Sequence, residues 1–521
     1  MSEPEISLQT ISPKPATRLW EILSFAVLLS VILFAPAKIG SLGFYPPDDA
    51  NRHVGKAISG KPWNQILVMR KDITTDMHHG WDTLLTFLHK RFGIGKYGLM
   101  AFSVSFCFIL FAALPLFFLR RPESWLIVLG YLNLFDPVEP LRFFVGRPFI
   151  IGCAMLTFLL LTWRNFAGPK TRFGWMAVLV AGIAIMAWLA PTAAYLFGIP
   201  LLGFALAREW RALIRLTLCI AVGSCIGYAL TGYPVQLVKN VSFMLFTGPD
   251  QHLLSRMLVT EFRPSAGNFM VLFSFIALIV WRVLRKKWDR RVIDNPLFFN
   301  AVCGMFLGVL IARFWLDWGF IAAMLWLATE INELLIEYFA FNDVRRFVLC
   351  GAVAAVFFVI LTADTGSRWT FMAPRFECIY EKAKPEEKKW FPDSGGIIYN
   401  DHMEAFYELF FDNPQAPWRY VLGFEPELML PEDLKVYRAI QYMSNQVDSY
   451  QPWVDKMRPC DRMMVLTEGK QQPDIGRLEW HYINRNTWFG RLPQKPAEQG
   501  QADTAVHKNI VPSNRGKKAA S

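Results

Sequence analysis

A series of long apolar runs, separated by short polar connections, dominates this chain of 521 residues. The first run is Leu19–Ile39, and about eleven such runs are suited to crossing a bilayer, although several are short. A segment that crosses lipid must satisfy its backbone hydrogen bonds internally, so these runs fold as helices. The sequence therefore predicts a mainly α-helical bundle that crosses the membrane many times.

Composition supports this interpretation and excludes a nucleic-acid-binding protein. Charged residues make up 19% of the chain and hydrophobic residues 53%, and the mean hydropathy is +0.27. A soluble globular protein carries about 25% charged residues. Much of the positive charge behind the net charge of +11 lies at the ends of apolar runs, where the positive-inside rule places it.

Basic clusters at every second connection predict the orientation. Placing them in the cytoplasm gives a cytoplasmic N-terminus, an external C-terminus and all eight histidines outside, as expected of a bacterial inner-membrane protein. The least regular stretch is Gly174–Ala207, where we expect two short spans to form a hairpin around Pro191. The clusters are Arg120–Arg121, Arg164 with Lys170 and Arg172, Arg208 with Arg211 and Arg215, Arg282 to Arg291, and Arg345–Arg346.

The composition divides the chain into four parts. A polar cytoplasmic tail (1–18) precedes the membrane domain (19–363), which includes a large external loop, the first loop (41–96). After Asp364 the chain becomes richer in Pro, Trp and Tyr, so residues 364–492 are predicted to form an extracytoplasmic mixed α/β domain. A disordered basic tail (493–521) follows. A disulfide between Cys378 and Cys460 is compatible with an external location.

Two adjacent carboxylates, Asp48 and Asp49, stand at the start of the first loop. Acids at the mouth of an apolar helix are costly unless they bind a ligand or move protons. A short helix is predicted over Ala50–Ser59, on which Asp49, His53 and Lys56 share one face. The alternative is that one of the two acids simply caps this helix.

A second polar cluster lies later in the first loop. His78, His79 and Asp82 are side chains that bind divalent cations, so a weak metal site is one hypothesis. A polar surface at a helix start is the alternative. No metal-type cysteine spacing is present.

Several arginines at the outer membrane boundary could bind a phosphate. Arg142 and Arg147 lie in the connection after the third run, Arg256 in the external loop 232–267, and Arg313 at the end of a later span. A guanidinium binds phosphate with two parallel hydrogen bonds, which lysine cannot do as well. Their alternative role is in local ion pairs, and Asp317 is the nearest acid to Arg313 in helical spacing.

The chain lacks the motifs of nucleotide-dependent enzymes. It contains no Gly-rich phosphate loop followed by Lys-Ser/Thr, and no dinucleotide fingerprint. No nucleotide cofactor is therefore expected, while a divalent cation is left open. A group transfer at the external face would need a donor that is already activated there.

This arrangement resembles the GT-C superfamily of membrane glycosyltransferases, which use polyprenyl-phosphate-linked sugars. The resemblance rests on Asp48-Asp49-Ala50-Asn51-Arg52-His53, followed by Ala57-Ile58-Ser59-Gly60, and on Arg313 before aromatic residues at an outer helix end. Protein mannosyltransferases and aminoarabinose transferases in this superfamily typically carry Asp-Glu, so Asp-Asp is a mild departure. The large loop, the number of spans and the external C-terminal domain also agree.

The resemblance implies a transferase that moves a sugar from a polyprenyl-phosphate donor to a glycan, lipid or protein acceptor at the external membrane face. One carboxylate would be the general base or hold a metal. Position in the motif favours Asp48 as base and Asp49 as its partner, although the sequence does not decide between them. His53 and Lys56 would contact substrate, and Arg142, Arg147, Arg256 or Arg313 would bind the lipid phosphate.

Three other functions fit parts of the pattern. An O-antigen polymerase or ligase would rely on external arginines and a histidine. A transporter or flippase would place ionisable residues at mid-membrane and often shows inverted repeats, but here the acids and histidines gather at one face. An envelope-assembly protein would use its external domain for binding, with the acid pair as a helix cap only.

Overall fold

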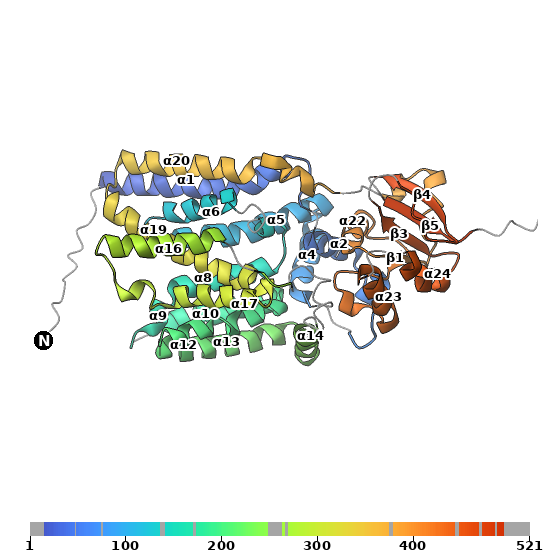
Figure 1. The fold of residues 1–521 in the computed structure, drawn as a ribbon, viewed down its shortest axis with the longest axis horizontal. Helices are drawn as coiled ribbons and strands as arrows, with labels where there is room; N and C mark the ends of the chain where they lie inside the picture. The colour runs from blue at the N-terminus through green and yellow to red at the C-terminus, as the bar shows by residue number, and fades with distance from the viewer. Residues whose placement is uncertain are drawn as a thin grey trace, which may run out of the picture.

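A helical bundle and a smaller α/β unit lie end to end (Figure 1). The bundle is built from residues before Ala363, and the α/β unit from residues after it. The computed structural model describes residues 15–46, 48–73, 77–135, 141–169, 173–247, 263–265, 269–374, 379–442, 447–467, 471–484 and 487–493.

The bundle confirms the predicted mainly α-helical membrane fold. Five helical stretches in the described ranges are long and apolar enough to cross a bilayer, and five further apolar helices are shorter. The chain is thus an integral membrane protein. The long stretches contain α1 (Pro15–Gly40), α5 (Lys96–Ala113), α13 (Trp210–Leu230), α19 (Phe320–Tyr338) and α20 (Val344–Thr362). The shorter ones are α6 (Glu123–Phe135), α8 (Phe149–Thr162), α10 (Phe173–Leu189), α16 (Phe269–Leu284) and α17 (Pro296–Gly308).

The stretch Gly174–Ala207 contains one substantial helix followed by short pieces. After α10 the chain forms a 3₁₀ turn at Pro191–Ala194, then α11 (Tyr195–Gly198) and α12 (Leu201–Leu206). Pro191 and Pro200 each lie at a break, because proline lacks the amide hydrogen that continues a helix. The second short span predicted here is therefore interrupted.

The first loop forms three helices at the end of the bundle that faces the α/β unit (Figure 1). These are α2 (Asp49–Ser59), α3 (Trp63–Ile66) and α4 (His79–Phe92). Helix α2 begins one residue before the predicted start, and Asp48 is its N-cap. Gly60 ends the helix with a left-handed backbone (φ +62°), a conformation that glycine adopts without strain.

The α/β unit has a five-stranded mixed sheet of order β2-β1-β3-β5-β4. Strand β1 runs parallel to β2 and β3, whereas β5 pairs antiparallel with β3 and β4. The elements are β1 (Ile397–Asn400), α22 (Met403–Asp412), β2 (Arg419–Tyr420), α23 (Pro431–Tyr442), α24 (Gln451–Lys456), β3 (Arg462–Leu466), β4 (Glu479–Asn484) and β5 (Thr487–Arg491).

The α/β unit is hydrogen-bonded directly to the first loop. The backbone amide of Val68 donates to the carbonyl of Tyr420 (2.8 Å), which extends the sheet beyond β2. The Arg70 amide donates to the carbonyl of Leu428 (3.0 Å). Lys61 Nζ donates to the carbonyl of Ala416 (2.7 Å). The loop and the α/β unit therefore form one layer over the end of the bundle.

Close packing of α22 on α2 depends on Gly55. A Cβ atom at this position would lie 2.8 Å from the ring of Phe410. We expect Gly55→Ala to lower the Tm. Overpacking should reduce the free energy of unfolding by about 1–3 kcal/mol, although alanine is the better helix former. Gly351→Ala is the matched control, since no described atom lies within 4 Å of its Cβ position. Equal Tm values for the two variants would contradict this packing role.

Candidate functional site

The first acid of the pair, Asp48, is held by an arginine from another connection. Arg147 donates through Nε to Asp48 Oδ1 (2.7 Å) and through Nη2 to Oδ2 (2.9 Å). Oδ1 also accepts the backbone amide of Asp49 (2.5 Å). Asp48 is thus a helix cap, as the alternative interpretation held, and it also fixes Arg147. A carboxylate offers about four acceptor positions, so a further donor can still approach Oδ2.

The second acid, Asp49, is held by its own helix. Arg52 Nε donates to Asp49 Oδ1 at 2.6 Å. The guanidinium of Arg52 is buried and lies 4.0 Å from the ring centre of Phe424, a residue of the α/β unit. Its Nη2 atom lies 3.3 Å from His78 Nδ1. The side chain of Asp49 remains partly exposed, so a ligand can reach it.

The electrostatics distinguish the two acids. Burial raises the pKa of Asp48, and Asp49 adds to this effect while Arg147 opposes it. Burial also acts on Asp49, but Arg52 and Arg147 outweigh it and hold the pKa of Asp49 below its usual value. Asp48 is therefore the better proton acceptor of the pair, and Asp49 is the more firmly ionised.

The predicted metal ligands are not gathered at one point. Asp82 Oδ1 lies 2.5 Å from His53 Nδ1, and both side chains are buried. His78 instead contacts Arg52, and His79 packs edge-on against Tyr233. Within the described residues, no group of three or more His, Cys, Asp and Glu side chains could hold a metal ion. The physical reason is that consecutive histidines at the start of α4 point in different directions.

Two of the predicted phosphate-binding arginines share one buried acid. Arg142 Nη2 donates to Asp317 Oδ1 (2.7 Å) and Arg313 Nε donates to Oδ2 (3.0 Å). The predicted pairing of Arg313 with Asp317 is thus confirmed. Asp317 lies in a π-helical turn (Trp315–Gly319), a feature often found at functional sites. Both guanidinium groups remain partly exposed, whereas the Asp317 side chain is fully buried.

The α/β unit contributes two residues that the sequence analysis missed. Burial raises the pKa of Tyr407 on α22 well above its usual value, and the charge of Asp49 adds to the effect. Burial and the neighbouring Glu427 raise the pKa of Glu425 to about 8, while Arg313 opposes the shift. Both groups therefore lie within electrostatic reach of the acid pair. Glutamates on both sides of a proline in the apolar stretch 421–430 are the sequence signal that could have indicated Glu425.

The raised pKa of Glu425 predicts a pH-dependent stability. Folding favours the neutral form of Glu425. Its contribution to the free energy of unfolding is therefore fully present below about pH 4.3, the pKa of an unfolded glutamate, and is lost as the pH rises through 8. Between pH 6 and pH 9, we expect the free energy of unfolding to fall by at least about 2 kcal/mol less in Glu425→Gln than in wild type, since one pKa unit corresponds to about 1.4 kcal/mol. The measurement is the difference in Tm between pH 6 and pH 9. The exposed Glu386→Gln is the control, and equal pH dependence in wild type and Glu425→Gln would contradict the assignment.

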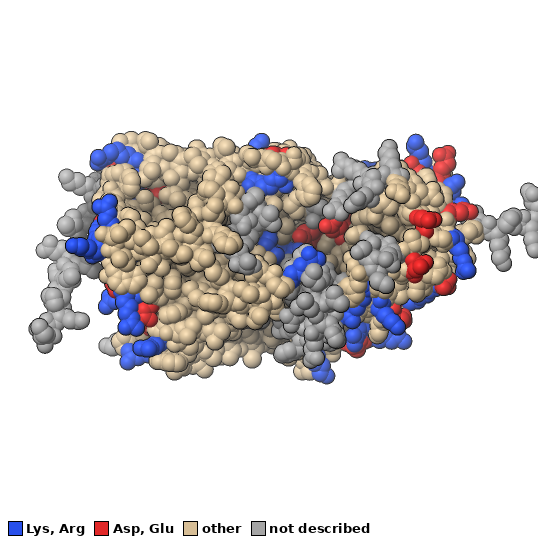
Figure 2. All heavy atoms as spheres, in the orientation of Figure 1, with Lys and Arg blue, Asp and Glu red and all other residues tan. Residues whose placement is uncertain are grey.

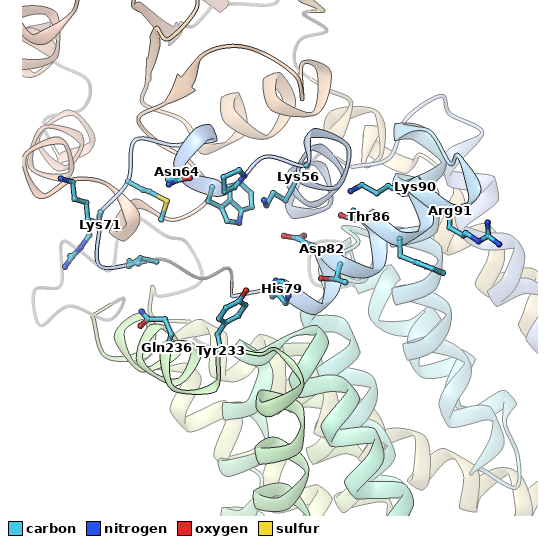
Figure 3. A pocket seen from close by; sticks show the side chains of 18 residues that line it. Lys56, Asn64, Lys71, His79, Asp82, Thr86, Lys90, Arg91, Tyr233 and Gln236 are labelled. Atoms are coloured by element: carbon cyan, nitrogen blue, oxygen red, sulfur yellow. The ribbon is translucent and has the colours of Figure 1, made fainter.

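A cavity of about 1140 Å³ lies between the first loop and the start of α14 (Pro234–Thr247). Figure 3 shows Lys56 on one side, Tyr233 and Gln236 on the opposite side, and His79 and Asp82 between them. Asp48 and Asp49 do not line it.

The structure brings most of the predicted site residues to the end of the bundle that carries the α/β unit. Asp48 contacts Arg147, Asp49 contacts Arg52, and the two arginines bonded to Asp317 form a separate cluster. Lys56 lines the cavity and donates to the carbonyl of Lys61. Arg256 and Cys378 lie outside the described residues, so their roles stay predictions.

Comparison with one solved structure shows the same fold. The chain matches ArnT from Cupriavidus metallidurans bound to undecaprenyl phosphate with a TM-score of 0.50 and 13% identity, over 90% of this chain and 97% of that one. It also matches the oligosaccharyltransferase AglB from Archaeoglobus fulgidus, in complex with an inhibitory peptide and a dolichol-phosphate, with a TM-score of 0.46 and 10% identity, over 84% and 69%. The first match confirms the GT-C-like fold predicted from the sequence. No protein-family model and no curated protein matches the chain.

Proposed function

We propose that the chain is a membrane glycosyltransferase that moves a sugar from a polyprenyl-phosphate donor to an acceptor. The observation that carries this proposal is the pairing of Asp48 with Arg147, at the same end of the bundle as the Arg142–Asp317–Arg313 cluster. A proton-accepting carboxylate and phosphate-binding arginines are the two parts that such a reaction needs. The structure in complex with undecaprenyl phosphate, reported for ArnT, makes this donor class the natural one to test.

In this mechanism Asp48 is the general base. The acceptor hydroxyl gives its proton to Asp48 as its oxygen forms a bond to the anomeric carbon of the sugar. The bond between that carbon and the lipid phosphate oxygen breaks, and the phosphate leaves with the electron pair. Arg147 orients Asp48 through a hydrogen bond, and Asp49 holds Arg52 through another.

The leaving phosphate is stabilised by Arg142 and Arg313. Asp317 holds both guanidinium groups in place, and because each is partly exposed, each can still donate to a ligand. The neutral form of Glu425 can donate a hydrogen bond to a phosphate oxygen near Arg313. A preorganised group of donors of this kind lowers the barrier without reorganising during the reaction.

We place this site at the external face of a bacterial inner membrane. Lys and Arg gather at the opposite end of the bundle in Figure 2, as the positive-inside rule requires of the cytoplasmic side. The basic clusters predicted to be cytoplasmic include Arg121, which donates to Glu123 at 2.6 Å, and Arg282, which pairs with Glu330. The acid pair and the α/β unit (364–492) would then face outward.

The proposal is tested with purified protein in lipid nanodiscs and a panel of radiolabelled polyprenyl-phosphate sugars. We expect at least one donor to yield free polyprenyl phosphate together with a glycosylated acceptor. A transporter or flippase would instead move the lipid across the membrane of a proteoliposome and leave the sugar–phosphate bond intact. Bound donors that all remain uncleaved would overturn the proposal.

A further inference from the structure

The cavity between the first loop and α14 has a distinctive chemical lining. Among its described residues, Lys56, Arg70, Lys71, Lys90 and Arg91 are cationic, and Asp82 is the one acid. Asp82 already forms a hydrogen bond with His53. Trp63 and Tyr233 add aromatic surface, and Asn64, Thr86 and Gln236 add hydrogen-bonding groups. Aromatic faces with a few polar groups and an excess of positive charge suit a polar, anionic ligand.

Three of the cations are available to such a ligand. Lys71, Lys90 and Arg91 are exposed, and none of them forms a salt bridge with another described residue. Arg70 is different, because it pairs with Asp72. Figure 3 shows Lys71 on one side of the cavity and Lys90 and Arg91 on the other, so positive charge lies at both ends of the opening.

Helix α14 borders the cavity through Gln236. In Figure 1, α14 is viewed along its axis, whereas α10 and α13 run across the page, so α14 crosses the direction of the bundle. Tyr233, Val235 and Val238 at its start are exposed, with 53%, 69% and 45% of their surface accessible. An exposed apolar face on a helix in this orientation is typical of an interfacial helix. A ligand attached to a lipid could thus enter beneath it.

The cavity and the acid pair lie at opposite ends of α2. Lys56 faces the cavity from the last turn of α2, and Asp49 lies seven residues earlier on the same helix. At 1.5 Å per residue this separation is about 10 Å along the axis. A short oligosaccharide can span it, with one end in the cavity and a hydroxyl beside the acid pair.

We infer that this cavity binds the acceptor and that the acceptor is an acidic saccharide. The inference rests on the proposed transferase function and adds the chemical class of its acceptor. The carboxylate or phosphate groups of the saccharide pair with Lys71, Lys90 and Arg91, and its sugar rings pack on Trp63 and Tyr233. The acidic saccharide could be a soluble glycan or the headgroup of a glycolipid, since both present the same chemistry.

The test is direct binding to the purified protein in nanodiscs, without donor. One arm uses a short oligogalacturonate against its neutral methyl ester, and the other a sialylated glycolipid against its asialo form. We expect the acidic member of at least one pair to bind at least tenfold more tightly, with an affinity that falls as salt rises. Preference for the acidic soluble glycan or for the acidic glycolipid identifies the source.

Two variants locate the binding. Lys90→Gln with Arg91→Gln, and separately Lys71→Glu, are each expected to raise the Kd at least tenfold. Lys382→Gln with Lys389→Gln, exposed on the α/β unit, is the control with the same loss of charge as the first variant. If neutral and acidic saccharides bind alike, or if cavity and control variants bind alike with unchanged Tm, the inference is overturned. If the protein did not prefer acidic saccharides, it could still transfer the sugar from the donor to another acceptor, so failure of this inference is distinguishable from failure of the proposed function.

Discussion

Asp48→Asn is expected to lower the rate of sugar transfer about 10³-fold, because removal of a general base typically costs 10²–10⁴-fold. Asparagine is as good an N-cap as aspartate, so the start of α2 should be preserved. Asp49→Asn should cost less, about tenfold to a hundredfold, since it loses a charged hydrogen bond to Arg52. The rates are measured in nanodiscs at saturating donor.

The matched control for these variants is Asp72→Asn. Asp72 belongs to the same loop, is largely exposed and pairs with Arg70. We expect wild-type transfer and a wild-type Tm for this variant. If Asp48→Asn and Asp49→Asn were also as active as wild type, the acid pair would be only a structural cap.

Arg142→Gln and Arg313→Gln are each expected to weaken binding of polyprenyl phosphate by about tenfold to a hundredfold. A hydrogen bond to a charged group contributes about 1.5–3 kcal/mol, and each 1.4 kcal/mol is a tenfold change in Kd. The two effects should not add, because both arginines are fixed by Asp317. Native mass spectrometry of the nanodiscs gives the Kd values.

Arginine-to-lysine variants and a distant arginine are the controls here. Arg313→Lys keeps the charge but not the planar fork, so we expect it to fall between wild type and Arg313→Gln. Arg164→Gln removes an exposed arginine next to α8 and should leave the Kd unchanged. Equal Kd values for wild type and both glutamine variants would remove Arg142 and Arg313 from the phosphate site.

The membrane bundle could be predicted because its physical cause is local. A long apolar run in lipid is stable only when its backbone hydrogen bonds are satisfied internally, as in a helix, and α1 covers the predicted run Leu19–Ile39. Helix α2 was predicted over Ala50–Ser59, and the structure begins it one residue earlier, at Asp49. The prolines Pro191 and Pro200 had a larger effect than expected, because hydropathy takes no account of the hydrogen bonds that they remove.

The site was less predictable because its parts meet only through tertiary contacts. The pairing of Asp48 with Arg147 joins residues 99 positions apart, and Arg142 is 175 positions from Asp317. The spacing of residue types along the sequence gives no information about contacts between residues so far apart. Tyr407 and Glu425 were missed for the same reason, since they reach the acid pair only when the α/β unit packs on the first loop.

A single-turnover experiment tests the central claim most directly. Wild type and Asp48→Asn are loaded with the same radiolabelled polyprenyl-phosphate sugar, bound donor is quantified, and release of polyprenyl phosphate is followed after acceptor is added. The account predicts equal donor binding and release that is about 10³-fold slower in Asp48→Asn. Equal release rates at equal donor occupancy would contradict it.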